Sequence, residues 1–138
     1  MDFITLWNEI SNTARDDYYS LSEAEQTLFN IKSIADNSCE GGLKSYYLSF
    51  AGAYASDAAE QLYSLGLDLI AAVIENCNSL FPDGIPPEND AERTEIIDDW
   101  GSEYDYLFDD WTDTVLDNIT ELESEIDSLY EKISADRA

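Results

Sequence analysis

Apolar residues recur along this chain at the spacing of α-helices. Between Phe3 and Ile10, and again between Leu28 and Ile34, apolar side chains fall three or four residues apart, which places them on one face of a helix. No stretch alternates apolar and polar residues over more than four positions, as a half-buried strand does. The pattern therefore predicts an all-α protein with about six or seven helices, folded as a single compact domain over residues 1–138.

Local signals mark several helix ends. Ser22 and Glu25 fit the S-x-x-E capping box, in which each side chain accepts a hydrogen bond from the backbone of the other residue. The Gly41–Gly42 pair then breaks the helical pattern, and a new helical face begins at Leu43. Residues 81–87 contain three prolines and a glycine, which preclude a helix there.

The chain changes character after this proline-rich segment. Residues 88–138 hold 18 of the 31 acidic residues but only three of the six basic ones, and their apolar residues keep helical spacing throughout. Thr120 and Glu123 form a second capping-box pattern, so we expect a break in this segment near Asn118. The pattern predicts a long acidic helical region rather than a disordered acidic tail.

Six acidic residues in this region recur at every fourth position. They are Asp105, Asp109, Asp113, Asp117, Glu121 and Glu125. On a continuous helix this spacing forms one solvent-facing ridge, the acidic ladder, in which each step rises about 6 Å. Like charges four residues apart disfavour a helix by roughly 0.2–0.5 kcal/mol per pair, and a surface kept for solubility normally mixes both signs. The ladder therefore indicates a surface for a cationic partner.

Ten acidic residues form the candidate partner-binding surface, where carboxylates would take the place of phosphates. They are Asp98, Asp99, Glu103, Asp105, Asp109, Asp110, Asp113, Asp117, Glu121 and Glu125. Thirteen acidic residues lie between positions 98 and 131, which gives about one charge per 4 Å along a straight helix of about 50 Å. One DNA strand carries a charge per about 3.4 Å. An exposed Tyr106 among these acids would add a cation–π contact to arginine; the alternative is that Tyr106 belongs to the core.

The overall charge narrows the class of partner. With 31 acidic and six basic residues, the formal net charge is -25 at pH 7, which disfavours direct contact with nucleic acid or anionic membranes and favours cationic partners. No apolar run approaches the roughly 18 residues of a membrane span, and the N-terminus lacks the basic region of a signal peptide. We therefore expect a cytoplasmic protein without membrane contact.

The residue types present offer little for catalysis or metal binding. The chain has no histidine, the commonest general base and metal ligand, and no GxSxG, P-loop or HExxH motif. Neither residues 98–103 nor residues 83–90 fit the EF-hand pattern for calcium. Cys39 and Cys77 form no CxxC pair and are each expected to be buried. We expect no enzyme activity, no cofactor and no dedicated metal site.

One segment carries a family resemblance. Residues 40–52, EGGLKSYYLSFAG, resemble the N-G-G-F-x-Q-Y/F-F signature of a bacterial family of unknown function that includes a neisserial DNA-mimic protein. The following alanine-rich helix, the proline-rich segment and Arg93 match the family's order of elements from about residue 21 onwards. The departures from the signature are Glu40, Leu43 and Ser45. The resemblance implies an all-α, dimeric protein and, as in the DNA-mimic member, occupation of the DNA site of a transcription factor.

We interpret the sequence as that of a DNA mimic. Its carboxylates would engage lysine and arginine residues of a basic DNA-binding protein, such as a regulator, nucleoid protein or defence protein, and exclude DNA. Two alternative functions would use the same negative charge. One is an immunity- or antitoxin-type inhibitor of a basic toxin, and the other is an acidic structural interaction domain. A merely solvated acidic face, or halophilic adaptation, would also produce a chain rich in acids. Competition with duplex DNA separates a mimic from an inhibitor whose target does not bind nucleic acid.

Overall fold

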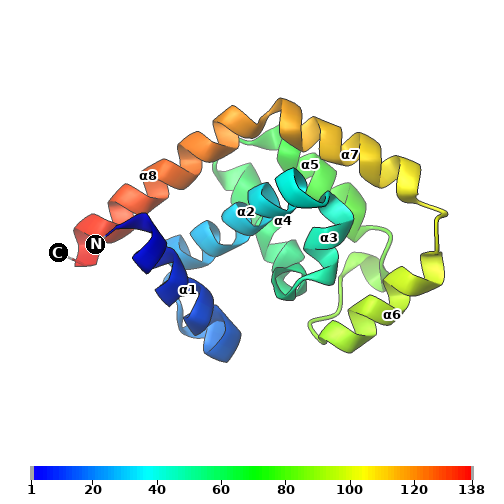
Figure 1. Cartoon of the computed structure of the whole chain (residues 1–138), viewed down its shortest axis with the longest axis horizontal. Helices are drawn as coiled ribbons and strands as arrows, with labels where there is room; N and C mark the ends of the chain where they lie inside the picture. The colour runs from blue at the N-terminus through cyan, green and yellow to red at the C-terminus, as the bar shows by residue number, and fades with distance from the viewer. Residues whose placement is uncertain (1, 138) are drawn as a thin grey trace.

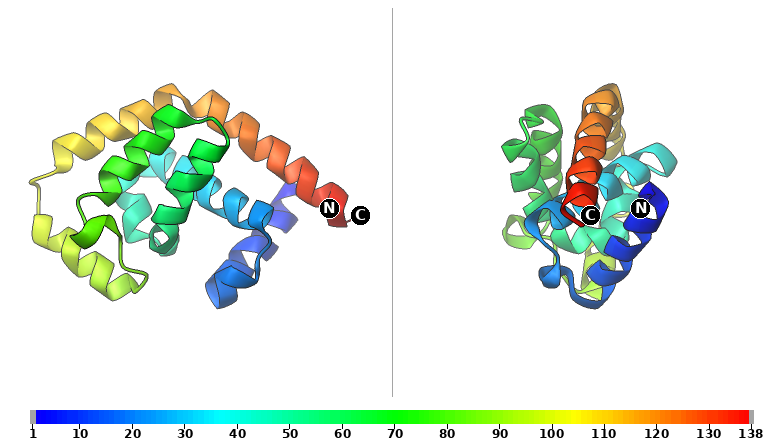
Figure 2. Two further views of the ribbon diagram at one scale, coloured as in Figure 1. Left: turned by 180° about the vertical axis from the view of Figure 1, so that it is seen from behind. Right: turned by 90° about the vertical axis from the view of Figure 1, so that its left-hand side faces the viewer.

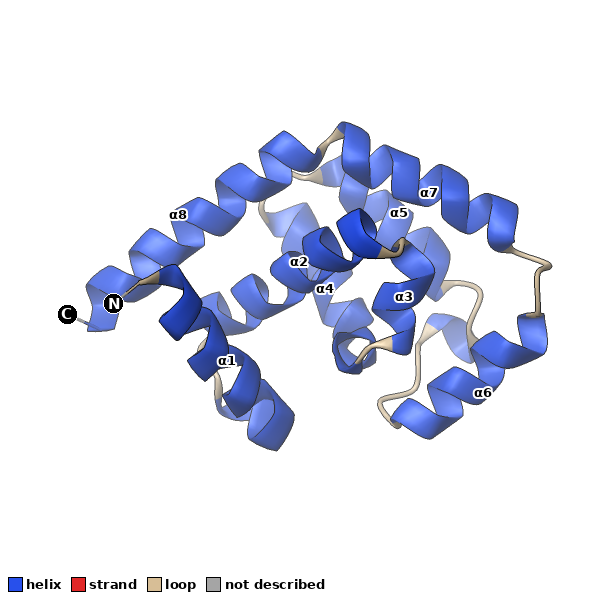
Figure 3. Ribbon diagram, viewed as in Figure 1, coloured by secondary structure: helices blue, strands red, loops and turns tan. Residues whose placement is uncertain are grey.

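The computed structural model describes residues 2–137 as helices joined by short turns (Figures 1 and 3). The α-helices are α1 (Phe3–Asp17), α2 (Glu23–Glu40), α3 (Leu43–Leu48), α4 (Ala55–Ser64), α5 (Asp68–Asn78), α6 (Asp90–Trp100), α7 (Asp105–Asp117) and α8 (Ile119–Arg137). Three short 3₁₀ helices are η1 (Tyr18–Ser20), η2 (Phe50–Tyr54) and η3 (Pro82–Gly84). No strand occurs between residues 2 and 137, which confirms the all-α prediction, with eight α-helices where six or seven were expected.

Local signals fix the ends of α2 as predicted. The Ser22 hydroxyl accepts a hydrogen bond from the Glu25 N–H at 3.2 Å, and the Glu25 carboxylate accepts one from the Ser22 N–H at 2.9 Å. At the other end, Gly41 caps the helix and Gly42 adopts a φ of 92°. Glycine enters this left-handed region without the steric cost that a Cβ imposes. The two glycines therefore turn the chain sharply from α2 into α3.

The acidic region forms three helices instead of one long one. Gly101, with a φ of 56°, ends α6. The predicted break at Asn118 also occurs, because its side-chain amide donates to the Thr114 carbonyl at 2.8 Å and caps α7. α8 starts directly after Asn118, so Thr120 is its second residue and the capping box predicted there is wrong. α7 and α8 are the two arms of an arch along one edge of the molecule (Figure 1).

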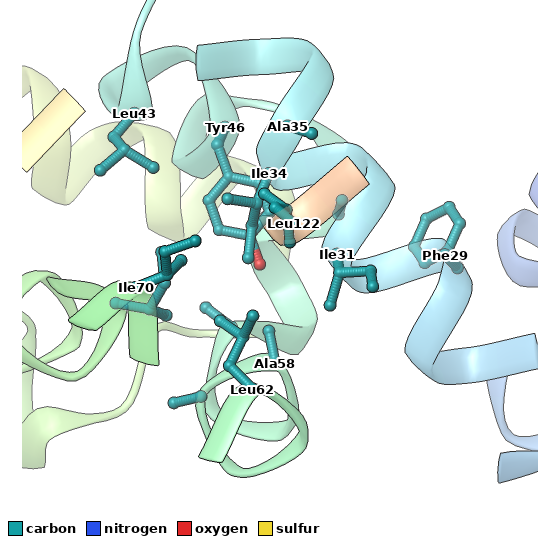
Figure 4. Packing of buried hydrophobic residues seen from close by; sticks show 14 of the residues in the cluster. Phe29, Ile31, Ile34, Ala35, Leu43, Tyr46, Ala58, Leu62, Ile70 and Leu122 are labelled. Atoms are coloured by element: carbon teal, nitrogen blue, oxygen red, sulfur yellow. The ribbon is translucent and has the colours of Figure 1, made fainter. Parts of the chain in front are cut away.

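The hydrophobic core lies beneath this arch. Side chains from five helices converge there (Figure 4). They include Ile34 of α2, Tyr46 of α3, Leu62 of α4, Ile70 of α5 and Leu122 of α8, all fully buried. Each buried aliphatic side chain of this size contributes about 1.5–3 kcal/mol. The acidic helices are thus anchored to the core through their apolar faces, and their position is set by packing.

A buried arginine joins α6 to the segment that follows α3. Arg93 is 1% exposed. Its Nε donates to the Tyr47 carbonyl at 2.7 Å, and its Nη2 donates to the Ser49 carbonyl and the Asp90 carboxylate, both at 2.7 Å. Its Nη1 donates to the Pro87 carbonyl at 2.8 Å. One guanidinium therefore binds carbonyl groups at the end of α3 and in the proline-rich segment, and of these the Ser49 carbonyl also accepts the Gly52 N–H at 3.1 Å.

The N-terminal end of α1 lies close to the C-terminal end of α8 (Figures 1 and 2). Arg137, in the last turn of α8, donates to Glu9 of α1 at 2.6 Å and to Glu25 of α2 at 2.5 Å. Burial opposes ionisation of Glu25, but hydrogen bonds from Arg137 and from Ser22 outweigh it and hold the pKa of this carboxyl below its usual value of 4.5. The two ion pairs therefore connect α1 and α2 to the last turn of α8.

We expect Glu25→Gln to lower the free energy of unfolding at pH 7 by about 0.5–1 kcal/mol, because it removes the ion pair with Arg137 while glutamine still completes the capping box. The ionised carboxylate is the stabilised form. The difference from wild type should therefore be fully present above pH 4.5 and should vanish as the pH falls through the lower, folded-state pKa. Urea unfolding of both proteins from neutral to acidic pH measures it. A difference that stays constant over this range would contradict the assignment.

Candidate acidic interface

The predicted partner-binding residues lie on the outer surface of the acidic helices. Nine of the ten are exposed, and Glu125 is half-buried. Asp98 and Asp99 are on α6, Glu103 is in the following turn, Asp105, Asp109, Asp110, Asp113 and Asp117 are on α7, and Glu121 and Glu125 are on α8. The apolar residues Phe108 and Val115 of α7 are buried on the opposite side. This confirms that the ladder and the core face of α7 point in different directions.

The ladder does not form the one straight ridge that was predicted. The bend at Asn118 separates Asp117, the last residue of α7, from Glu121 on α8. α7 carries five acidic residues in 13 positions and α8 carries six in 19, which is about one charge per 4–5 Å along each arm at 1.5 Å per residue. The charge density expected of a straight 50 Å helix is therefore kept within each arm, although the ridge is bent.

One lysine reaches the start of the ladder. Lys44 of α3 donates to the Asp105 carboxylate at 3.1 Å and to the Gly101 carbonyl at 3.1 Å. Sequence spacing does not reveal this pair, because its two members are 61 positions apart. The other acids of α7, which are Asp109, Asp110, Asp113 and Asp117, form no ion pair with any described residue. The unneutralised part of the ladder on α7 therefore begins at Asp109.

Tyr106 stands among these acids with its ring in solvent. Its side chain is 67% exposed, which decides between the two positions left open by the sequence, solvent and core. Asp109 and Asp110 lie three and four positions further along α7, on the same side of the helix. An aromatic face flanked by carboxylates is an arrangement that attracts a guanidinium both by charge and by cation–π contact.

A hollow opens beside the ladder where α7 meets the turn between α2 and α3. It has a volume of about 420 Å³. Its lining residues are Ser38, Cys39, Glu40, Gly41, Gly42, Asp109, Thr112 and Asp113. The Thr112 hydroxyl accepts a hydrogen bond from the Leu43 N–H at 3.0 Å, which holds α7 against the turn. In the sequence the glycine pair and the ladder are separate features, whereas the fold brings them together.

The two cysteines differ in their surroundings. Cys77 is buried as expected, and burial raises the pKa of its thiol. Cys39 is exposed, so the expectation that it is buried is wrong. It belongs to the last turn of α2, which extends past the core to the edge of the hollow. A helical pattern alone does not show where the neighbouring elements stop covering a helix.

The carboxylates of this surface do not converge on a point. Successive members of the ladder are separated by about 6 Å along the helix axis. Between residues 2 and 137, no group of three or more acidic or cysteine side chains is placed to hold a metal ion. Over the same range, no helix combines the length and apolar character of a membrane span.

Comparison with known proteins agrees with the resemblance found in the sequence. A family model described as DMP19-like protein matches residues 19–135. No curated protein and no solved structure matches the chain. The matched range runs from η1 to the last turn of α8 and contains the 40–52 segment, Arg93 and the acidic helices, while α1 lies outside it. The chain belongs to the DMP19-like protein family.

Proposed function

We propose that the protein is a DNA mimic, whose carboxylates on α6, α7 and α8 occupy the DNA-binding site of a basic DNA-binding protein and exclude DNA from it. The observation that carries this proposal is the row of exposed acids on α7 from Asp109 to Asp117, which has no cation of its own beside it among the described residues. Membership of the DMP19-like family supports the same function.

The physics of the surface favours a cationic partner over any other. α7 carries about one charge per 4 Å and α8 about one per 5 Å, against about one per 3.4 Å on a single DNA strand. A net charge of -25 repels nucleic acid and steers a basic protein into fast, salt-sensitive association. The protein would then act by binding rather than by catalysis, in the cytoplasm, where a DNA-binding partner works. Homodimer formation, implied by the family resemblance, remains a prediction for sedimentation analysis.

Duplex DNA and the protein should compete for the same partner. We expect immobilised protein to retain one or more basic proteins from a native lysate at low salt, and a large excess of duplex DNA to release them. Raising the ionic strength from about 0.05 to about 0.5 M should weaken retention at least about tenfold, because screening shortens the reach of the charges. Mass spectrometry before and after DNA addition identifies the released proteins.

Two results would contradict this proposal. If the immobilised protein retains no basic protein at low salt, it has no cationic partner of the proposed kind. Retention that excess duplex DNA leaves unchanged would instead indicate a partner that does not bind nucleic acid, such as a basic toxin. A neutral polymer added in place of DNA is the control for non-specific release by crowding. All buffers are free of heparin.

A further inference from the structure

The hollow between α7 and the α2–α3 turn combines several acceptor groups and no cation. Asp109 and Asp113 project from successive turns of α7, and Glu40 comes from the end of α2 on the other side. None of the three carboxylates is paired with a cation among residues 2–137. The hollow is therefore a concave part of the acidic surface in which three carboxylates have no cation.

The C-terminal end of α2 adds to the negative potential. The Asn37 carbonyl accepts hydrogen bonds from the N–H groups of both Gly41 and Gly42, at 2.9 and 2.8 Å, and the Leu43 N–H is directed to Thr112 instead of back to α2. No backbone N–H of the described chain is thus left for the carbonyls of residues 38–40. Unpaired carbonyls at a helix C-terminus carry the negative end of the helix dipole.

A buried hydroxyl in the same hollow lacks a partner. Ser38 lines the hollow, is only 4% exposed, and has a hydroxyl oxygen that makes no hydrogen bond with any described group. Buried polar groups in folded proteins nearly always have a partner. A ligand with hydrogen-bond donors that entered the hollow would supply one. This oxygen is independent of the acidic residues and points to the same kind of ligand.

We infer that the hollow binds an arginine side chain of the basic partner, and this inference rests on the proposed function. A guanidinium is always charged and carries five donors in a planar fork, which suits carboxylates presented from two sides. The hollow offers carboxylates, a hydroxyl and main-chain carbonyls, all of them acceptors, and its volume of about 420 Å³ accommodates one such side chain. A lysine ammonium has three donors at one point and is more strongly hydrated, so it satisfies fewer of these groups.

Paired double variants test the inference. Asp109→Asn with Asp113→Asn removes two charges from the hollow, whereas Glu60→Gln with Glu75→Gln removes two from exposed positions of α4 and α5, outside the acidic surface. We expect the first pair to weaken binding of a hexa-arginine peptide at least about tenfold, since each lost charged hydrogen bond has an effect of this order. The control pair should weaken it less than about threefold. Wild-type protein should bind hexa-arginine at least about fivefold more tightly than hexa-lysine.

Cys39 provides a direct reporter of occupancy. It is exposed at the edge of the hollow, and the second cysteine, Cys77, is buried with a raised thiol pKa, so iodoacetamide should modify Cys39 alone. Saturating hexa-arginine should slow this alkylation at least about fivefold in wild type and in the control pair. In the Asp109→Asn, Asp113→Asn variant the same peptide concentration should give little protection. Circular dichroism verifies that both double variants keep the wild-type helix content.

The outcomes separate this inference from the proposed function. Equal losses in the two double variants, with Cys39 unprotected, would overturn the role of the hollow and leave attraction by net charge alone. Hexa-lysine binding as tight as hexa-arginine would overturn the choice of arginine. Failure of the wild-type protein to bind either peptide at low salt would contradict the proposed function as well.

Discussion

Replacing Arg93 with methionine should lower the free energy of unfolding by about 3–5 kcal/mol. Methionine keeps much of the side-chain volume but has no donor, so the carbonyls of Tyr47 and Pro87 would lose their hydrogen bonds, and the Ser49 carbonyl would keep only the one from the Gly52 N–H. A buried acceptor without a partner costs about 1–3 kcal/mol, and two of them, together with the weakened Ser49 acceptor, exceed what is regained by no longer burying a charge. The Asp90 carboxylate is mostly exposed and returns to water at little cost.

Urea unfolding followed by circular dichroism measures this effect. Arg15→Met is the matched control, because Arg15 is an exposed arginine on α1 whose guanidinium lies 5.4 Å from the Phe50 ring. Its loss should cost less than about 1 kcal/mol. If the two variants unfold at the same urea concentration, the guanidinium of Arg93 does not hold α6 to the α3 segment in the way that the hydrogen bonds indicate.

Features governed by neighbours in sequence could be predicted from the chain alone. The capping box at Ser22, the glycine turn before α3 and the break at Asn118 each depend on a few adjacent residues. The exposed and buried faces of α7 also follow from spacing, because a helix places residues three and four apart on one side. Phe108 is accordingly buried and Asp109 exposed.

Features that depend on distant segments could not be predicted in this way. The Lys44–Asp105 pair and the Thr112–Leu43 hydrogen bond join residues more than 60 positions apart. No local pattern encodes which turn will lie beneath α7, so the hollow is absent from the sequence-based candidate site. The bend of the ladder could be predicted at Asn118, but its direction is set by the packing of α7 and α8 on the core.

The structure gives a physical reason for the family resemblance. The elements that carry it are scattered along the chain, yet the glycine that closes the 40–52 segment lies against Arg93. A Cβ on Gly52 would stand 2.7 Å from the Tyr47 carbonyl oxygen and 2.9 Å from the Arg93 Nε, both too close for a side chain. The glycine and the arginine are thus parts of one contact, and the proline-rich segment supplies a further carbonyl to it. These matches concern the fold, while the proposed function rests on the acidic helices.

Reversing three charges on α7 should abolish binding of the basic partner. Asp109, Asp113 and Asp117 are exposed and form no ion pair with a described residue, and Asp105 is left unchanged because it pairs with Lys44. Close charge pairs across an interface are worth about 1.5 kcal/mol or more each, so changing all three to lysine should weaken binding at least about 10³-fold. Helix content should persist, since lysine is a good helix former.

The control must change the net charge equally without touching α7. Asp16, Glu60 and Glu75 are exposed residues of α1, α4 and α5 that form no ion pair with a described residue, and their change to lysine gives the same net charge. This variant should bind the captured partner within about tenfold of wild type, because distant charges act only through the screened overall field. Titration calorimetry of both variants at one salt concentration shows whether the partner recognises the acidic surface of α7 or only the net charge of the protein. Equal losses would mean that net charge alone attracts the partner, and an unchanged affinity of the α7 variant would remove the ladder from the interface.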